Sequence, residues 1–242
     1  MNEEEYKARR TEFWNSDPFG NGRLIYPYFD TKSWLEGRRK YLCASEASDV
    51  IGIGFNSNVT LWKAKTGRIN QDEHSPQSLE LMRKGSENEE LSRKQWAIDT
   101  GHEVIDGGKI LVVNSEILDA RGKPFLACTL DSVGIKETGS MYDIELKRSE
   151  SIKLFPKDRM PDKYRAQVIH QMIVTGLREA ALVARIVWFE AGIRNVVERE
   201  YWLSCDYPSV KYDMEKLLEL ETRFWNEYVL TGKEPPLILP TI

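Results

Sequence analysis

The chain has little cysteine and little histidine, which limits the metal sites and cross-links that it can build. Among its 242 residues there are three Cys and three His. The cysteines, Cys43, Cys128 and Cys205, lie far apart, and no Cys-x-x-Cys pair occurs. The sequence therefore indicates neither a structural zinc site nor a disulfide framework. Unpaired thiols are typical of a reducing, intracellular compartment.

Long apolar runs and sequence repeats are also missing. The first ten residues, MNEEEYKARR, are charged and lack the apolar segment of a secretory signal. Elsewhere, charged residues interrupt the apolar stretches within a few positions, so we expect no membrane span. Neither an internal repeat nor a low-complexity tract is visible.

Positive charge is not in excess. The 34 Lys and Arg against 38 Asp and Glu give a net charge of −4, which excludes a globally basic nucleic-acid coat but allows a local basic groove. With about 150 residues per domain as a guide, we expect one domain over 1–242. Aromatics mixed with Asn, Gly, Asp and Pro favour an irregular N-terminal arm over 1–30. The stretch 204–242 is expected to form a C-terminal helix and tail.

The spacing of apolar residues predicts helices first and strands later. Helices are expected over 31–38, 42–53 (with Ser45 as N-cap), 59–66 and 78–100. Strands are expected over 109–118, 124–130 and 141–148, with 132–140 as a loop between the last two. A helix over 163–175, strands over 180–189 and 193–203, and a helix over 210–230 complete the chain. Hairpin-like strands followed by a helical crossover predict an α/β (α+β) fold, with a mixed central β-sheet flanked by helices.

The segment 142–147 alternates strictly between apolar and charged residues. Its period of two puts Asp143, Glu145 and Lys147 on one face of a strand. Asp131 ends the preceding apolar strand, so a tight antiparallel pair would bring it close to Glu145 and Lys147. Two carboxylates repel each other unless a cation lies between them, and Mg²⁺ favours such a site. Taken alone, the alternation is more typical of a solvated strand face.

Five segments together resemble a known family. Asp-x13-Glu-x-Lys resembles the core of PD-(D/E)XK nucleases. Four further matches are Ser33-Trp-Leu-Glu-Gly-Arg-Arg followed by Ala44-Ser-Glu-Ala-Ser, then Gly85-Ser-Glu-Asn-Glu, Ala127-Cys-Thr-Leu-Asp, and the segment 164–176, YRAQVIHQMIVTG. In this order, over roughly 34–189, they resemble phage lambda exonuclease and the YqaJ-type viral recombinase nucleases. Two positions depart: Leu130 replaces the family's proline, and Thr129 replaces its serine but keeps a hydroxyl.

The resemblance implies a metal site. Asp131 and Glu145 would ligate the metal, together with the backbone carbonyl of Ile144 or Glu145 itself. Glu89 would ligate a second metal or its waters. Two Mg²⁺ ions, for which Mn²⁺ is expected to substitute, suit phosphodiester hydrolysis because they stabilise both the attacking and the leaving oxygen. Taken singly, Glu89 is more typical of a solvated first turn of a helix, where acidic residues are favoured.

The resemblance also implies roles around the metal. Lys147 would position the attacking water, and Gln167 would line the site from the later helix. Arg38, Ser45 and Thr129 would hold a 5′-phosphate, since an arginine fork beside a hydroxyl binds a terminal phosphate without reading bases. Taken singly, Arg38 belongs to a basic run that is usually solvated.

The implied function is a Mg²⁺-dependent 5′→3′ double-stranded DNA exonuclease. It would leave 3′ overhangs for phage-type homologous recombination in the cytoplasm of a bacterial or phage-infected cell. The resemblance further implies a ring-shaped homotrimer, duplex DNA ends as substrate and a single-strand annealing protein as partner.

Two alternatives remain open. One is a PD-(D/E)XK endonuclease or a Cas4-like nuclease, although the missing cysteine cluster speaks against an iron–sulfur protein. The other is a catalytically idle DNA-binding module on the same fold. The presence of Asp131, Glu145 and Lys147 speaks against that second alternative.

Overall fold

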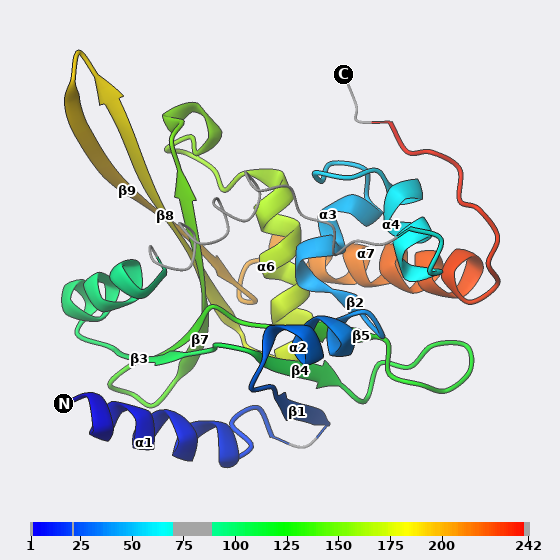
Figure 1. Ribbon diagram of the computed structural model, residues 1–242, viewed down its shortest axis with the longest axis horizontal. Coiled ribbons are helices and arrows are strands. Elements are labelled where there is room, and N and C mark those ends of the chain that lie inside the picture. Colours follow the sequence, from blue (N-terminus) through cyan, green and yellow to red (C-terminus); the bar gives the residue numbers. More distant parts are fainter. Residues whose placement is uncertain (1, 21, 70–88, 240–242) are drawn as a thin grey trace.

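The computed structural model describes residues 2–20, 22–69 and 89–239, and two mixed sheets organise it (Figure 1). The strands are β1 (Arg23–Pro27), β2 (Leu42–Cys43), β3 (Glu103–Asp106), β4 (Ile110–Asn114), β5 (Leu126–Cys128), β6 (Ser132–Ile135), β7 (Met141–Ser149), β8 (Glu179–Glu190) and β9 (Ile193–Ser204). The main helices are α1 (Glu3–Asn15), α2 (Thr31–Arg38), α3 (Ala47–Val50), α4 (Asn58–Lys65), α6 (Asp162–Thr175) and α7 (Pro208–Phe224). Residues 89–100 are helical as well, and short turns lie at η1 (Ala44–Glu46), η2 (Ile152–Leu154) and the π turn η3 (Trp225–Val229).

The five-stranded sheet has the order β3-β6-β7-β8-β9. Its strands are antiparallel except for β7 and β8, which are parallel. Parallel neighbours need a crossover connection, and α6 provides it. The second sheet, β1-β4-β5-β2, is also mixed, because β2 runs parallel to β5. The expectation of a mixed sheet flanked by helices is therefore confirmed, with two sheets where one was expected.

Helix α6 lies at the centre of the molecule (Figure 1). It packs against β5 of one sheet, β7 and β8 of the other, and α7. The residues that it buries include Val168, Ile169 and Met172, all at most 1% exposed. Burial of apolar area stabilises the fold by roughly 25 cal/mol per Å². Residues on α6 are thereby fixed relative to both sheets.

The first thirty residues are not an irregular arm. Residues Glu3–Asn15 form α1, which starts in a capping box between Asn2 and Glu5. Phe13 and Trp14 of this helix are buried, and the Trp14 indole donates to the carbonyl of Asp106. The Asn-x-x-Glu spacing was the signal for a helix start that the mixed composition obscured.

Two further expectations are corrected. The stretch 132–140 contains β6 as well as a turn, because Val133 alternates with small residues that pack tightly against β7. The stretch 42–53 is not one helix: Leu42 and Cys43 pair with β5 first, so Ser45 lies inside η1 and caps no helix. The expected helix over 78–100 is present from residue 89 onward, and 78–88 lie outside the described residues.

The core includes the side chains of Trp14, Trp62 and Trp96. Within the described ranges, no helix is both long and apolar enough to cross a membrane.

Candidate active site

The β6–β7 hairpin brings the expected acidic residues together. Its register pairs Ser132 with Ile144, so the next residue outward, Asp131, comes level with Glu145. One carboxylate oxygen of Asp131, Oδ2, accepts a hydrogen bond from the backbone N–H of Leu146 at 2.8 Å. This approach was expected from a strand over 124–130 paired with the strand over 141–148. The structure achieves it through β6, which begins immediately after Asp131.

Glu145 is buried, with 1% of its surface exposed, and its carboxylate accepts hydrogen bonds from three side chains. The Lys147 ammonium and the Gln167 amide, the latter at 2.5 Å, both donate to Oε1. The Gln171 amide donates to Oε2 at 2.6 Å. Gln167 was expected at the site and Gln171 was not. Their spacing of four residues places both on one face of α6, which was the available signal.

The charges at this site do not balance. Burial, and then the charge of Glu145, raises the pKa of Asp131 well above its usual value, and the same causes raise the pKa of Glu89. The positive charge of Lys147 opposes both shifts. Burial disfavours the Lys147 ammonium itself, but Glu145 and Asp131 outweigh that effect and raise its pKa. The site therefore concentrates negative charge that a further cation would stabilise.

Asp143 is a fourth carboxyl group that sequence reasoning placed on the right face but gave no role. It is fully buried, and within the described ranges neither of its oxygens has a hydrogen-bond partner. Burial raises its pKa well above the usual value, and Glu145 and Asp131 add to the shift. A buried carboxyl group without donors is costly, so this residue adds to the demand for a cation.

The donor types at the site fit a hard divalent cation. Carboxylate and carbonyl oxygens are the ligands that Mg²⁺ prefers. In the part of the chain that the structure describes, no three His, Cys, Asp or Glu side chains already converge as a complete metal cage. Mg²⁺ usually binds through one or two carboxylates and keeps several waters, so Asp131 and Glu145 are sufficient as protein carboxylates.

The backbone at the site offers one more oxygen. In an antiparallel ladder the N–H and the carbonyl of one residue point to the same side. Since the Leu146 N–H faces Asp131, the Leu146 carbonyl faces that side as well. Ile144 lies two residues before Leu146 on β7 and pairs with Ser132 of β6. Its role as a backbone ligand stays a prediction, and Leu146 joins it as a candidate.

The three residues expected to hold a 5′-phosphate form a second cluster. Arg38, at the end of α2, donates to the Ser45 hydroxyl at 2.8 Å. Its guanidinium carbon lies 4.6 Å from the ring centroid of Trp34. The Trp34 indole in turn donates to the Thr129 hydroxyl at 3.1 Å. Trp34 therefore links Arg38 and Thr129, a link that the sequence did not predict.

The two clusters are joined by one short piece of chain. Thr129 belongs to the phosphate cluster and Asp131 to the carboxylate cluster, and two residues span at most about 7 Å. Between them Leu130 is buried. Gly107 packs against this segment so closely that a Cβ at position 107 would overlap the carbonyl oxygen of Leu130. The backbone N–H of Gly107 also donates to the carbonyl of Asp131. Gly107 thus holds this segment in place at Leu130 and Asp131.

Residues 33–178 match the sequence model of the YqaJ-like viral recombinase domain, which is more than half of the chain. The chain belongs to the YqaJ-like viral recombinase family. It is 24% identical over 206 residues to the protein YqaJ of Bacillus subtilis, a match that covers 84% of this chain and 58% of that relative. The chain thus spans less than two thirds of the length of this curated relative.

The fold of this YqaJ-like protein is shared with a solved exonuclease. The alkaline exonuclease LHK-Exo from Laribacter hongkongensis is 18% identical, with a TM-score of 0.49. The same enzyme in complex with dAMP is 19% identical, with a TM-score of 0.50. Each match covers 84% of this chain and 97% of the other. At this level of identity the likeness shows a shared fold.

In this YqaJ-like protein, His170 of α6 is fully buried. Its Nδ1 lies 2.7 Å from a carboxylate oxygen of Glu221 on α7, and its Nε2 lies 3.0 Å from the Ala127 carbonyl oxygen on β5. Burial disfavours the charged imidazolium, but Glu221 outweighs burial and raises the pKa of His170. His170 therefore ties α6 to α7 and β5.

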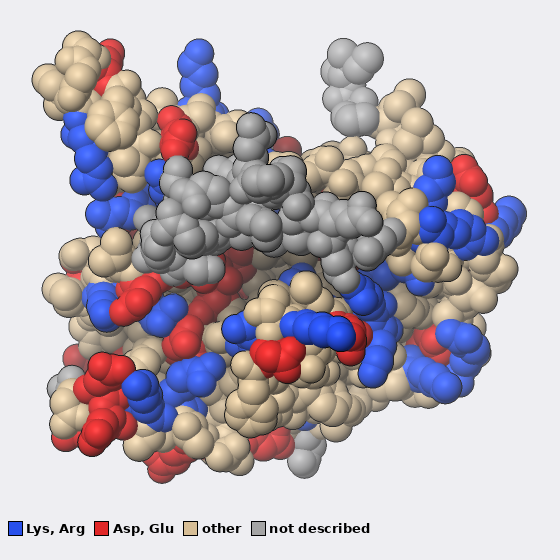
Figure 2. Space-filling view, in the orientation of Figure 1, with Lys and Arg blue, Asp and Glu red and all other residues tan. Residues whose placement is uncertain are grey.

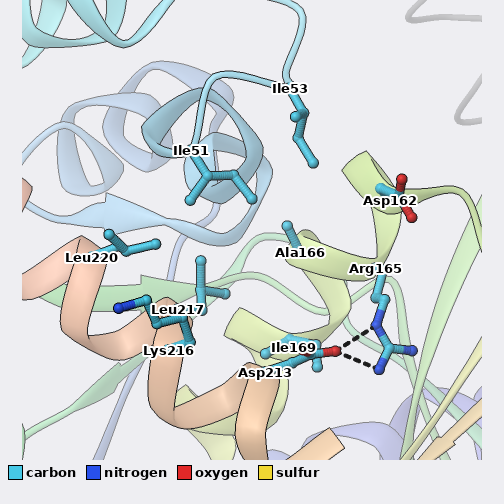
Figure 3. A pocket seen from close by; sticks show the side chains of 10 residues that line it. All are labelled: Ile51, Ile53, Asp162, Arg165, Ala166, Ile169, Asp213, Lys216, Leu217 and Leu220. Carbon is cyan, nitrogen blue, oxygen red and sulfur yellow. Dashed lines mark hydrogen bonds and ion pairs between the residues drawn. The ribbon is translucent and has the colours of Figure 1, made fainter. Parts of the chain in front are cut away.

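A cavity of about 300 Å³ lies on the other face of α6 (Figure 3). Ile51, Ala166, Ile169 and Leu217 are among its apolar lining residues. The ion pair between Arg165 and Asp213, at 2.6 Å, lies at its edge. Helical spacing puts Ala166 and Ile169 on the face opposite Gln167 and Gln171. The cavity is therefore separate from the carboxylate cluster.

Proposed function

We propose that this protein is a Mg²⁺-dependent exonuclease that degrades one strand of duplex DNA from a 5′ end and leaves a 3′ overhang. The observation that carries the proposal is the direct connection of the two clusters through the segment 129–131. One cluster has the groups for phosphodiester hydrolysis, and the other has the groups for a terminal phosphate. An endonuclease would need the first cluster but not the second.

Asp131 and Glu145 are the side chains that would hold Mg²⁺, together with a carbonyl of Ile144 or Leu146. Glu89 would hold a second ion or its waters. When bound, Mg²⁺ would stabilise charge on the phosphate oxygens and lower the pKa of a bound water. Gln167 and Gln171 keep the Glu145 carboxylate in one orientation, because each amide holds a different oxygen.

Lys147 is the chain's own group for positioning the attacking water. Its ammonium donates to Glu145 and stays charged because neighbouring carboxylates outweigh burial. An ammonium has three donors on a flexible stem, so it can bond Glu145 and a water together. Its position next to the carboxylates directs that water toward a phosphate bound there.

Arg38 and Ser45 would select the end of the strand. A terminal phosphate carries more charge and more free oxygens than an internal one, and a guanidinium beside a hydroxyl distinguishes the two. Trp34 stabilises the guanidinium from below through a cation–π contact. A ring-shaped homotrimer and a single-strand annealing partner remain part of this proposal, because the family resemblance implies them.

The test compares a linear duplex labelled at its 5′ ends with a covalently closed circle, in Mg²⁺, in Mn²⁺ and in chelator. We expect the label of the linear duplex to be released in small products, the circle to stay intact and chelator to stop all cleavage. Efficient nicking of the circle would favour the endonuclease alternative. Binding without cleavage in either metal would favour the idle DNA-binding module.

A further inference from the structure

Phe55 is an exposed aromatic residue close to the proposed active site. Its side chain is 77% exposed in the loop between α3 and α4. The Lys163 ammonium lies 3.9 Å from the centroid of its ring. Single exposed apolar residues are common on proteins, so Phe55 needs further observations before it indicates a site.

The first observation is that the loop holds Phe55 in a fixed position. Asp49, 5% exposed, accepts hydrogen bonds from the backbone N–H of Asn56 at 3.0 Å and from its side-chain amide at 3.2 Å. On the other side of Phe55, a Cβ at Gly54 would overlap the Asp49 carboxylate. Gly54 and Asn56, the two neighbours of Phe55, thus both contact the buried Asp49 carboxylate. Because the loop is already fixed, binding a ligand to the exposed Phe55 ring would cost little conformational entropy.

The second observation is a series of contacts from Phe55 to the catalytic lysine. The Lys163 ammonium also lies 4.8 Å from the ring centroid of Tyr164. The ammonium of Lys147, which donates to Glu145, lies 5.4 Å from the same centroid. Tyr164 is itself fixed by stacking on the buried Phe155, with ring centroids 5.3 Å apart and an interplanar angle of 6°. Aromatic rings and ammonium groups alternate from the exposed loop to the reacting groups.

We propose that Phe55 and Lys163 form a binding site for a nucleotide of the DNA substrate, with the base stacked on Phe55 and a phosphate held by Lys163. This rests on the proposed nuclease function and deepens it. Proteins that bind single-stranded nucleic acid combine such stacking rings with cations that follow the backbone. A base can come from the strand that is cut or from the emerging 3′ strand, and both present the same ring chemistry.

The test uses an end-fraying duplex that carries the fluorescent base 2-aminopurine, either near the 5′ end of the cut strand or at the matching place on the other strand. Binding is measured in chelator so that the DNA stays intact. Phe55→Ala should weaken binding about 5- to 150-fold, as expected for one lost base–aromatic stack. It should also remove the quenching of 2-aminopurine at one of the two places, which identifies the strand. Phe55→Trp should restore both effects.

Phe29, which is 96% exposed on a different loop, supplies the matched control. Phe29→Ala should leave binding and quenching unchanged. Lys163→Ala should reduce the slope of log affinity against log salt by about 0.7 to 0.9, the value for one phosphate contact. Equal behaviour of Phe55→Ala and Phe29→Ala, or no quenching at either place in the wild type, would overturn the inference. If wild-type cleavage of linear DNA is normal in that case, the proposed function survives while this site does not.

Discussion

The Lys147 side chain is half-buried, and the carboxylates beside it favour its charged form. A replacement at this position must therefore match both the shape and the charge of lysine. Lys147→Ala should lower the cleavage rate at least about 100-fold, the usual contribution of a positioned acid–base group. Lys147→Arg should not restore the rate, because a planar guanidinium cannot take the place of the ammonium beside Glu145. Single-turnover rates in Mg²⁺ measure both variants, with Lys153→Ala as a control in η2. A Lys147→Arg rate near wild type would reduce the lysine to a simple local charge.

Changes at Asp131 and Glu145 are expected to separate DNA cleavage from DNA binding. Asp131→Asn or Glu145→Gln should abolish cleavage while DNA binding persists, since each change removes a metal ligand and keeps the side-chain volume. Binding can even tighten, because the loss of a carboxylate reduces repulsion of phosphate. The two measurements are cleavage of linear duplex and its binding affinity in the same buffer. Substantial Mg²⁺-dependent turnover by either purified variant contradicts the site.

A change at Arg38 is expected to affect the recognition of a 5′ end and to leave the cleavage chemistry intact. Arg38→Ala should slow digestion of 5′-phosphorylated duplex strongly and of 5′-hydroxyl duplex little, because only the first substrate has a terminal phosphate to lose. The quantity to measure is the rate ratio of the two substrates at fixed salt. Lys32→Ala, at the exposed start of the same helix, serves as control. A uniform, salt-dependent loss on both substrates would mean that Arg38 is an ordinary surface charge.

At the scale of elements, the His170–Glu221 contact couples α6, α7 and β5, and it should make stability depend on pH. The pKa of His170 is raised in the folded state. The His170–Glu221 contact therefore stabilises the fold fully below about pH 6.5, the ordinary pKa of histidine. This stabilisation is lost as the pH rises through the pKa that His170 has in the folded state. His170→Gln should cost about 3 kcal/mol, because it leaves Glu221 buried without its partner.

Urea unfolding at several pH values tests this coupling. The wild type should lose stability between about pH 6.5 and more alkaline values, and His170→Gln should show a flatter dependence over that range. Glu221→Gln should flatten it as well. Identical pH profiles for the wild type and both variants would show that the contact is replaced by other interactions.

The elements also show which parts of the fold the sequence could predict. The helices over 31–38 and 163–175 were predicted from the sequence and are present as α2 and α6. Strand β6 was not predicted, because Ser132 and Gly134 carry no apolar pattern, and its pairing partners β3 and β7 are apparent only in the folded chain. The same limit applies to the site. Asp131, Glu145 and Lys147 came from spacing and resemblance, while Gln171 and Asp143 acquire meaning only when α6 packs onto β7.

At the scale of the whole molecule, the arrangement of charge matters more than its sum of −4. Figure 2 shows acidic side chains in the recessed centre of one face, with Lys and Arg side chains on either side. Such an arrangement suits a metal in the centre and a nucleic-acid backbone along the flanks. It also predicts that the metal stabilises the fold, because a bound cation offsets the burial and the charge of Glu145 that raise the pKa values of Glu89, Asp131 and Asp143.

The melting temperature should therefore rise with Mg²⁺ concentration. Ligand binding stabilises a folded protein by about 2.7 kcal/mol at 100 times the dissociation constant. Asp131→Asn should have a higher melting temperature than the wild type in chelator, and it should gain less from Mg²⁺. Thermal unfolding with Mg²⁺, with Ca²⁺ and with chelator measures this. An equal gain in the wild type and Asp131→Asn would place metal binding elsewhere.

In the proposed function, the segment Thr129-Leu130-Asp131 would also set the length of the fragment that is released. Only Leu130 lies between Thr129, which would help to hold the strand end, and Asp131, which would help to cut, and Gly107 packs against this segment. Its span of at most about 7 Å has room for one nucleotide step and no more. The product should then be a mononucleotide at every cut, whatever the base, and inserting one glycine after Thr129 should lengthen or scatter the products before it abolishes cleavage.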